Sequence, residues 1–216
     1  MKPLFQRAHS RAKNLKMTTP VCSLTSCLWW WLAFLNDFKP RPIPASLSNL
    51  PCIVSYSDGE GGLAGIGAAV WDPRRPKPLA LYTEVPSIIR DRWSKADDNE
   101  VRNDIYFVEA LGPLLLLIAF PNVLKDCLWI HFIDNTAAEA SLIRGSSSVE
   151  GGDHIVGLTW TMIQKQRLWA YFDRVESKAN PVDGLSRRRF HGPWDQVYMM
   201  DFPSIVLDEF VSTFGR

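Results

Sequence analysis

The amino-acid sequence predicts an α/β fold with the element order β-β-β-α-β-α-α-β-α. A run of three β-rich segments joined by short turns is typical of an antiparallel meander. The later β-rich segments alternate with stretches that are long and apolar enough to form helices. The 216 residues, 46 % hydrophobic and 22 % charged, suffice for one domain with a sizeable core and a flanking segment.

The first half of the domain contains the meander and an apolar helix. Strands are expected at 52–58, 66–71 and 79–85, because β-branched and apolar residues there are bounded by glycine- and proline-containing turns. Residues 86–104 are polar and irregular and predict no element. Residues 105–120 predict a helix, which the pair Gly112 and Pro113 should kink or restart.

The second half predicts two further strands, at 128–134 and 169–175, separated by helical segments. The first of these helices covers 135–144 and stops at Gly145, and the second covers 154–168. A short last helix that contains Asp183 is expected after Asn180 and Pro181. His131 lies inside a strand and is interpreted as a packed core histidine.

Three regions are predicted along the chain. Residues 1–50 form a basic arm, a helix over 24–38 and a proline-rich linker; residues 51–190 form the α/β domain; and residues 191–216 form an extension of unknown role. The apolar run 21–35 after a basic start imitates a signal peptide, but no small-residue cleavage site follows and the run is short for a bilayer. The four cysteines lack the C-x-x-C spacing of a zinc or redox site, and we interpret them as reduced thiols. Reduced thiols are typical of a cytoplasmic or nuclear protein, which is the location we expect.

Acidic residues stand at the ends of predicted strands. Asp58 ends the first strand and Asp134 the fourth, while Glu109 lies on the helix between them and Asp183 begins the last helix. Ligand sites in α/β sheets form at the carboxyl ends of strands, so two neighbouring strands that end in Asp would place both carboxylates at one edge. Clustered carboxylates take up protons or bind hard cations such as Mg²⁺. Two such ions, roughly 3.5–4 Å apart, suit phosphodiester hydrolysis.

Each acid also has a purely structural interpretation. Asp58 could be a turn residue, Glu109 one partner of a salt bridge, and Asp183 an acid in a first helical turn. Asp134 and Asn135 could cap the helix that follows. The net charge of +1 indicates no overall affinity for nucleic acid, so any basic surface must be local.

Four segments give the chain a resemblance to a known family. In chain order they are YSDGEGGLAGIGAAVWDP, YFVEALGPLLLL, HFIDNTAAEASLIRG and ESKANPVDGLSRR. They resemble the four motifs of type 1 ribonuclease H domains, and most of all the versions in the polyproteins of tyrosine-recombinase and long-terminal-repeat retrotransposons. The resemblance covers about residues 52–189. The helix LWWWLAFL and the proline-rich linker resemble the piece that joins a reverse transcriptase to its ribonuclease H.

The resemblance implies a fold, a chemistry and a partner. The family fold is a five-stranded mixed sheet, three antiparallel strands and then two parallel ones, flanked by helices, which agrees with the element order above. The family's four acids fall on Asp58, Glu109, Asp134 and Asp183, which would bind two Mg²⁺ or Mn²⁺ ions. The implied activity is endonuclease cleavage of the RNA strand of RNA–DNA hybrids, beside an upstream reverse transcriptase domain.

Contacts to the hybrid are expected from basic and polar side chains near the acids. The arginines 187–189, that is Arg187, Arg188 and Arg189, either contact phosphates or form a solvated helix end. Asn135 is expected to reach the minor groove and sense 2′-hydroxyls.

Two departures from the family pattern leave alternatives open. The loop 176–180 lacks the histidine that many cellular members carry before the last acid. Pro113 has no amide hydrogen to donate to the carbonyl of Glu109, which could shift that acid. The main alternative is therefore an inactive ribonuclease H-like module that binds nucleic acid; another enzyme on the same fold, such as an integrase or exonuclease, is the third.

Overall fold

The protein consists of two compact units, Met1–Ala45 and Ser46–Arg216. The computed structural model describes residues 28, 32, 35–36, 46–47, 49–62, 64–95, 104–149 and 151–208. In the first unit Leu28, Leu32 and Leu35 are helical and exposed. Most of the predicted arm, helix and linker lies outside the described residues.

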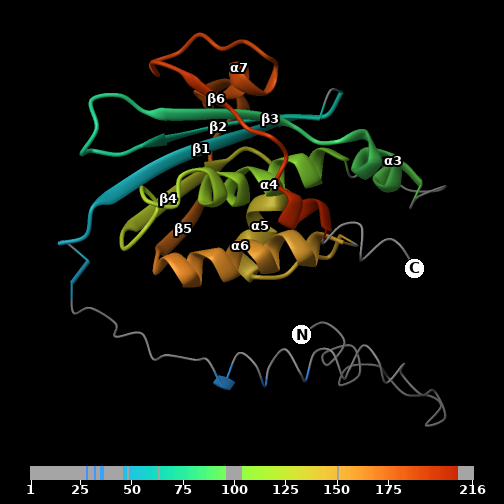
Figure 1. Ribbon diagram of the computed structural model, residues 1–216, viewed down its shortest axis with the longest axis horizontal. Helices are drawn as coiled ribbons and strands as arrows, with labels where there is room; N and C mark the ends of the chain where they lie inside the picture. The colour runs from blue at the N-terminus through green and yellow to red at the C-terminus, as the bar shows by residue number, and fades with distance from the viewer. Residues whose placement is uncertain are drawn as a thin grey trace. The chain divides into compact units, whose positions relative to one another are not determined.

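The second unit is built on a six-stranded sheet with the strand order β5-β4-β1-β2-β3-β6 (Figure 1). Strands β1, β2 and β3 are antiparallel neighbours, whereas β4 pairs in parallel with β1, β5 in parallel with β4 and β6 in parallel with β3. The strands are β1 Cys52–Glu60, β2 Gly65–Trp71, β3 Leu79–Glu84, β4 Leu128–Ile133, β5 Trp169–Arg174 and β6 Val197–Met199.

The predicted fold class, a mixed sheet of antiparallel and then parallel strands flanked by helices, is confirmed, with six strands in place of five. The additional strand β6 has three residues and comes from the segment that the sequence left without a role. Three residues are too few to show the period-two pattern that marks a strand. The extended conformation of β6 depends instead on its pairing with β3.

The helices cover the two faces of the sheet. Figure 1 shows α7 on one face and α4, α5 and α6 on the other. The helices are α3 Ser87–Lys95, α4 Asp104–Ala119, α5 Thr136–Arg144, α6 Gly152–Gln166 and α7 Asp183–Ser186, with a 3-10 turn η1 at Ser177–Ala179.

Two helices differ from the expectation. The region 86–104 was expected to hold no element, but α3 forms there; its sequence is largely polar, and buried Ile89 anchors it to the core. The helix α4 runs through Pro113 without a restart. Pro113 removes one backbone hydrogen bond, but the complete burial of leucines such as Leu111, Leu115 and Leu117 holds the helix against the sheet.

The apolar helix α4 forms the centre of the core. It packs on β1 and β2 and against α5 and α6, and its leucines meet Ile53, Ile66 and Trp129 of the sheet. Burying a side chain of this size stabilises the fold by about 1.5–3 kcal/mol. None of the helices in the described part of the chain combines the length and the apolar character needed to cross a membrane.

The opposite face of the sheet receives α7, and Gly67 on β2 makes this contact possible. A Cβ atom at Gly67 would lie 2.4 Å from Cβ of Leu185 and 2.5 Å from the backbone nitrogen of Ser186. Leu185 is fully buried with Val182, Ala69 and Trp194 in a second, smaller core cluster on this face. The short helix α7 therefore sits directly on the backbone of β2.

Replacing Gly67 with Ala is expected to destabilise the domain by about 1–3 kcal/mol, because the added methyl group overpacks the contact with α7. Urea unfolding measures this loss. The matched control is Gly157→Ala in α6, where a Cβ would meet no atom within 4 Å. There alanine should stabilise the helix by up to about 1 kcal/mol. Similar effects of the two substitutions would contradict the packing of α7 on β2.

Candidate metal centre and active site

Three of the four predicted acids meet at one edge of the sheet. One carboxylate oxygen each from Asp58, Glu109 and Asp134 lies within 4.8 Å of the other two. The parallel pairing of β1 with β4 sets Tyr56 opposite Phe132, so Asp58 and Asp134, two residues further along each strand, reach the same edge. Glu109 comes from α4, which packs on β1.

The close approach of α4 to β1 depends on Gly59. A Cβ atom there would lie 2.7 Å from the Val108 side chain and 3.0 Å from the backbone nitrogen of Glu109. In the absence of that atom the Gly59 amide donates a hydrogen bond to Oε1 of Glu109, at 3.0 Å. This bond directs the Glu109 carboxyl group toward the end of β1.

The Asp58 carboxyl group is 4 % exposed and is held from the far side of the sheet. The Ser186 hydroxyl of α7 donates to its Oδ2 atom. Burial is the main cause that raises the pKa of Asp58, which reaches about 6; the charges of Asp134 and Asp183 add to the rise, and the Ser186 hydrogen bond and the charge of Arg187 oppose it. In the absence of a cation, part of the Asp58 population is therefore protonated near neutral pH.

Glu109 is the most strongly perturbed acid of the three. It is 2 % exposed, and burial together with the charges of Asp134 and Asp58 raises its pKa to about 10, against the opposing Gly59 hydrogen bond. Its second oxygen, Oε2, is buried without a hydrogen-bond partner. The ionised form of Glu109 therefore has the Gly59 amide as a donor at Oε1 but no hydrogen-bond partner at Oε2.

This donor set fits a divalent cation. Three carboxylates within one ion's reach, one with an unsatisfied buried oxygen, are hard oxygen ligands of the kind that Mg²⁺ and Mn²⁺ prefer. A bound cation would supply the positive charge that the ionised acids lack. Such a site favours metal binding over the cap, turn and salt-bridge interpretations of Asp58 and Glu109.

Asp183 lies outside this three-acid group. Its side chain is 33 % exposed, and both oxygens are paired with arginines: Oδ1 with Arg187 at 3.0 Å and Oδ2 with Arg189 at 3.1 Å. Its negative charge nevertheless acts on Asp58, whose pKa it helps to raise. Asp183 thus stands at the margin of the acidic group.

The other residues expected to contact a hybrid have partners within the protein. Asn135 caps α5, its side-chain oxygen accepting from the amides of Ala137 and Ala138 at 3.0 Å. Arg188 donates through Nε to the hydroxyl of Tyr82 at 3.1 Å and to Glu84 at 2.9 Å. Arg187 and Arg189 pair with Asp183, and the side chains of all three arginines are exposed.

Several residues that support the site were not singled out from the sequence. Asn180 donates to the carbonyl of Ser57 at 2.9 Å and so fastens the segment before α7 to β1. Ser186, which binds Asp58, stands in the motif NPVDGLSR, but its partner lies 128 residues away. A serine near the last acid is the one sequence feature that could have indicated this contact.

His131 is a packed histidine, as predicted. It is fully buried in β4, with Nδ1 at 2.8 Å from the Ser55 hydroxyl and Nε2 at 3.0 Å from the Ser57 hydroxyl. Burial lowers its pKa to about 3, so the ring is neutral. The imidazole therefore joins β1 to β4 just below the edge where Asp58 and Asp134 meet.

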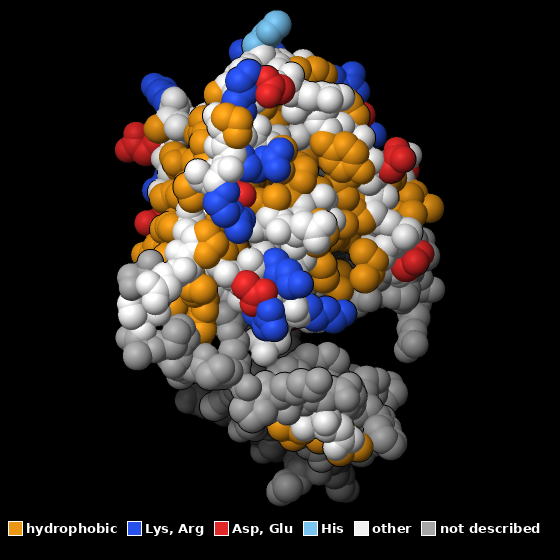
Figure 2. All heavy atoms as spheres, turned by 60° about the vertical axis from the view of Figure 1, so that its left-hand side comes forward, with side chains coloured by type: hydrophobic (Ala, Val, Ile, Leu, Met, Phe, Trp, Pro, Cys, Tyr) orange, Lys and Arg blue, Asp and Glu red, His pale blue; other side chains and the backbone are white. Residues whose placement is uncertain are grey.

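The opposite end of the sheet has a different charge character. The turn between β2 and β3 and the loop before β4 lie there, with exposed Arg74, Arg75, Lys77 and Lys125. Figure 2, which brings this end forward, shows Lys and Arg side chains gathered on it. The acids and this basic surface thus occupy opposite ends of β1.

No family model matches the chain, and no curated protein matches it either. Solved structures of ribonuclease H domains are similar to it. Ribonuclease H1 from the halophilic archaeon Halobacterium salinarum has a TM-score of 0.44 and 13 % identity, over 64 % of this chain and 96 % of that one. The N-terminal ribonuclease H domain of a Mycobacterium tuberculosis protein has a TM-score of 0.42 and 15 % identity, over 64 % of this chain and 93 % of that one.

A third neighbour, LC11-RNase H1 isolated from compost, has a TM-score of 0.42 and 12 % identity, over 66 % of this chain and 100 % of that one. TM-scores below 0.5 at such identities establish no shared activity. The function of this chain is therefore inferred from its own acids and its own sheet.

The raised pKa values predict how the stability of the metal-free domain depends on pH. Between its unfolded and its folded pKa an acid binds more protons in the native state, so the free energy of unfolding falls as pH rises. Asp58 contributes this fall up to about pH 6 and Glu109 up to about pH 10. For Glu109 alone the slope is about 1.4 kcal/mol per pH unit.

Urea unfolding in chelator at pH 5, 7 and 9 tests this expectation. The substitution Glu109→Gln should flatten the fall between pH 7 and pH 9, because glutamine cannot ionise. Added Mg²⁺ or Mn²⁺ should stabilise the unsubstituted domain most at high pH, since the cation binds the ionised native state. A Glu109→Gln domain with an unchanged pH profile would refute the assigned state of Glu109.

Proposed function

We propose that the chain is a metal-dependent endonuclease of the ribonuclease H type that hydrolyses the RNA strand of RNA–DNA hybrids. The observation that supports this most is the group formed by Asp58 on β1, Glu109 on α4 and Asp134 directly after β4, in the chain order of the sequence motifs; β1 continues two residues beyond Asp58, where the sequence had placed its end. Asp183 is proposed as the fourth acid of the site.

The four acids have separate roles in this proposal. Asp58 and Asp134 would be shared ligands of two Mg²⁺ or Mn²⁺ ions, with Glu109 as a further ligand for one ion and Asp183 for the other. When bound, such ions help water attack a phosphodiester and stabilise the leaving oxygen. The oxygen of water bonds to phosphorus and the bond from phosphorus to O3′ breaks, which leaves a 3′-hydroxyl and a 5′-phosphate.

Residues of the chain itself prepare the site. The Gly59 amide and the Ser186 hydroxyl each fix one carboxylate oxygen, so that the remaining oxygens of Glu109 and Asp58 are directed to the shared space. Asn135, Arg187, Arg188 and Arg189 are the proposed contacts to the hybrid. Arg187 and Arg189 stand beside Asp183, where a phosphate next to the acids would meet their guanidinium groups.

We further propose that the domain derives from a retrotransposon polyprotein, with an upstream reverse transcriptase domain as its partner. The support is the sequence of the motifs, above all the segments around Asp134 and Asp183, together with the helix and the proline-rich linker that precede the domain. A cytoplasmic or nuclear location suits the free thiols Cys52 and Cys127.

Cleavage of a labelled RNA–DNA hybrid tests the function. With Mg²⁺ or Mn²⁺ the RNA strand should be cut, whereas single-stranded RNA, duplex DNA and hybrid in chelator should stay intact. Asp58→Asn and Asp134→Asn should each lower the rate by at least 10³-fold, because each removes a ligand charge needed to hold the ions. The circular dichroism spectra of both variants should match that of the unsubstituted protein, which shows that the variants remain folded.

Asp126→Asn is the matched control for these substitutions. Asp126 precedes β4, at the end of the strand away from Asp134, and its left-handed backbone is one that asparagine adopts readily. Its rate should equal that of the unsubstituted protein. Full activity in the Asp58 or Asp134 variant would refute the assignment of the metal ligands.

A second candidate function is a ribonuclease H-like module that binds nucleic acid without cutting it. The observation in its favour is that Arg187 and Arg189 pair with both oxygens of Asp183, which stands outside the three-acid group. A folded domain that binds hybrid and leaves it intact with either metal would establish this alternative.

A further inference from the structure

Two adjoining pockets lie on the segment from η1 to β6, and the first of them includes Asp183 in its lining. The first, of about 570 Å³, is lined by the basic side chains of Lys178, Arg187 and Arg189, by Asp183 and by His191. The second, of about 640 Å³, is lined by rings and apolar side chains, among them Phe190, Trp194 and Met199. His191 lines both pockets, so they are continuous along the chain.

The first pocket has the charge that suits phosphate groups. Arg187 and Arg189 are exposed, and their ion pairs with Asp183 are surface pairs, which contribute about 0–1 kcal/mol each. A guanidinium has five N–H donors, so each arginine can bind a phosphate oxygen with the donors that do not face Asp183. Lys178 adds a further exposed cation at the same pocket.

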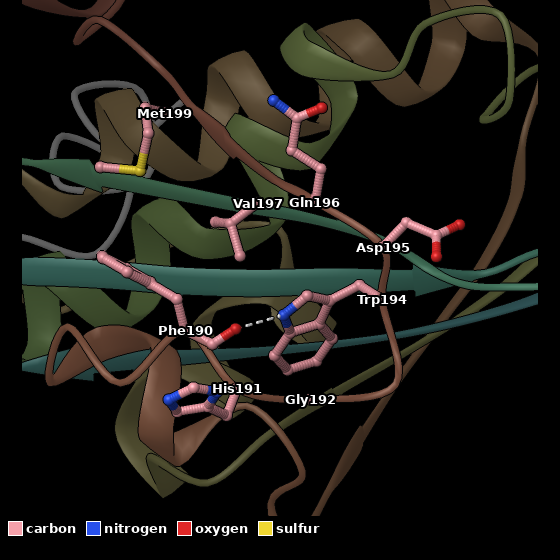
Figure 3. Close-up of a pocket in the computed structure, with 8 residues that line it drawn as sticks. All are labelled: Phe190, His191, Gly192, Trp194, Asp195, Gln196, Val197 and Met199. Carbon is pink, nitrogen blue, oxygen red and sulfur yellow. Dashed lines mark hydrogen bonds between the residues drawn. The ribbon is translucent and has the colours of Figure 1, made fainter.

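The second pocket has a rigid aromatic wall. Phe190 is 39 % exposed, and its ring stands edge-on against Tyr82, with the centroids 5.3 Å apart. Trp194 is buried, and its indole N–H donates to the carbonyl of Phe190 at 2.9 Å, which fixes the backbone under that ring. Figure 3 shows the rings of Phe190, His191 and Trp194 together, with the Asp195 side chain pointing away from them.

The pocket's own acid does not oppose a ligand of this kind. Asp195 forms an ion pair with Lys77 and so does not bring an uncompensated negative charge to the aromatic wall. A planar, apolar group can therefore lie against the open face of Phe190 without meeting a bare carboxylate.

We propose that the two pockets together bind an unpaired strand of nucleic acid, with phosphates at Lys178, Arg187 and Arg189 and one base stacked on Phe190. A polyanion that carries planar rings matches the chemistry of both pockets, which share His191 in their linings. A base paired within a helix has both faces covered by its neighbours, so the ligand is single-stranded RNA or DNA, such as an overhang of the hybrid. The choice of nucleic acid as the ligand class rests on the proposed function.

Fluorescence anisotropy in chelator, with the full chain, tests this site. The probes are single-stranded RNA and single-stranded DNA of about 12 nucleotides, which is within the site sizes of such proteins, and a blunt-ended hybrid. Phe190→Ala should weaken binding of a single strand by roughly tenfold, since it removes one stacking contact, with little effect on the blunt hybrid. Preference for the RNA or the DNA probe identifies which strand the site takes.

The arginines have a separate signature. In the double variant Arg187→Ala/Arg189→Ala the slope of log K against log salt for a single strand should fall by about 1.4, that is about 0.7 for each lost phosphate contact. The charge-matched control is Arg75→Ala/Lys125→Ala, which removes two exposed cations at the opposite end of the sheet. That control should leave the slope unchanged.

Two further variants separate stacking from stability. Phe190→Leu keeps an apolar side chain against Tyr82 but lacks the aromatic face, so it should lose single-strand binding as Phe190→Ala does. Tyr198→Ala is the matched aromatic control: Tyr198 is 52 % exposed on β6, and its ring lies toward Phe120 while its neighbours Val197 and Met199 line the pocket. Its affinity should not change.

Unchanged single-strand affinity in both Phe190 variants would overturn the proposal, and so would an equal loss for the blunt hybrid. Because binding is measured in chelator, a loss specific to Phe190 supports this site even where no hybrid is cut. Cleavage of the hybrid without any loss at Phe190 refutes this site alone and leaves the proposed function standing.

Discussion

The parallel pairing of β1 with β4 is the interaction on which the rest of the structure depends. It joins residues 76 apart in sequence, as the Ser55–His131 hydrogen bond shows, and it brings Asp58 and Asp134 to one edge of the sheet. The apolar helix α4 then buries its leucines against the same strands and presents Glu109 to that edge. Core packing and the assembly of the acids therefore depend on the same strands and the same helix.

That arrangement places like charges where water is excluded. Burial raises the pKa values of Asp58 and Glu109, and the unsatisfied Oε2 of Glu109 marks where positive charge is missing. Without metal, the repulsion between these buried carboxylates is relieved by protons that stay bound to the acids. A divalent cation would replace those protons. Stability, metal binding and the proposed hydrolysis thus depend on the same carboxyl groups.

How far the sequence predicts this structure follows from the range of each interaction. Strands β1 to β5 and helices α4 to α6 have local patterns of hydrophobicity, and acids at strand ends indicated the site. The polar helix α3 and the three-residue β6 depend on tertiary contacts, so their own sequences carry little pattern. The position of α7 on β2 is not specified by any local pattern. It decides the Ser186–Asp58 hydrogen bond and the pairing of Asp183 with Arg187 and Arg189.

The ionisation of Glu109 shows most directly whether the three acids form a cation site. It can be followed by ¹³C NMR of the Glu109 side-chain carboxyl group, whose resonance the Glu109→Gln variant assigns. We expect a Glu109 carboxyl group that is protonated at pH 7 in chelator and that ionises when Mg²⁺ is added at the same pH. A Glu109 that is already ionised at pH 7 without metal, and whose resonance does not respond to Mg²⁺, would contradict the claim that these acids form a cation site.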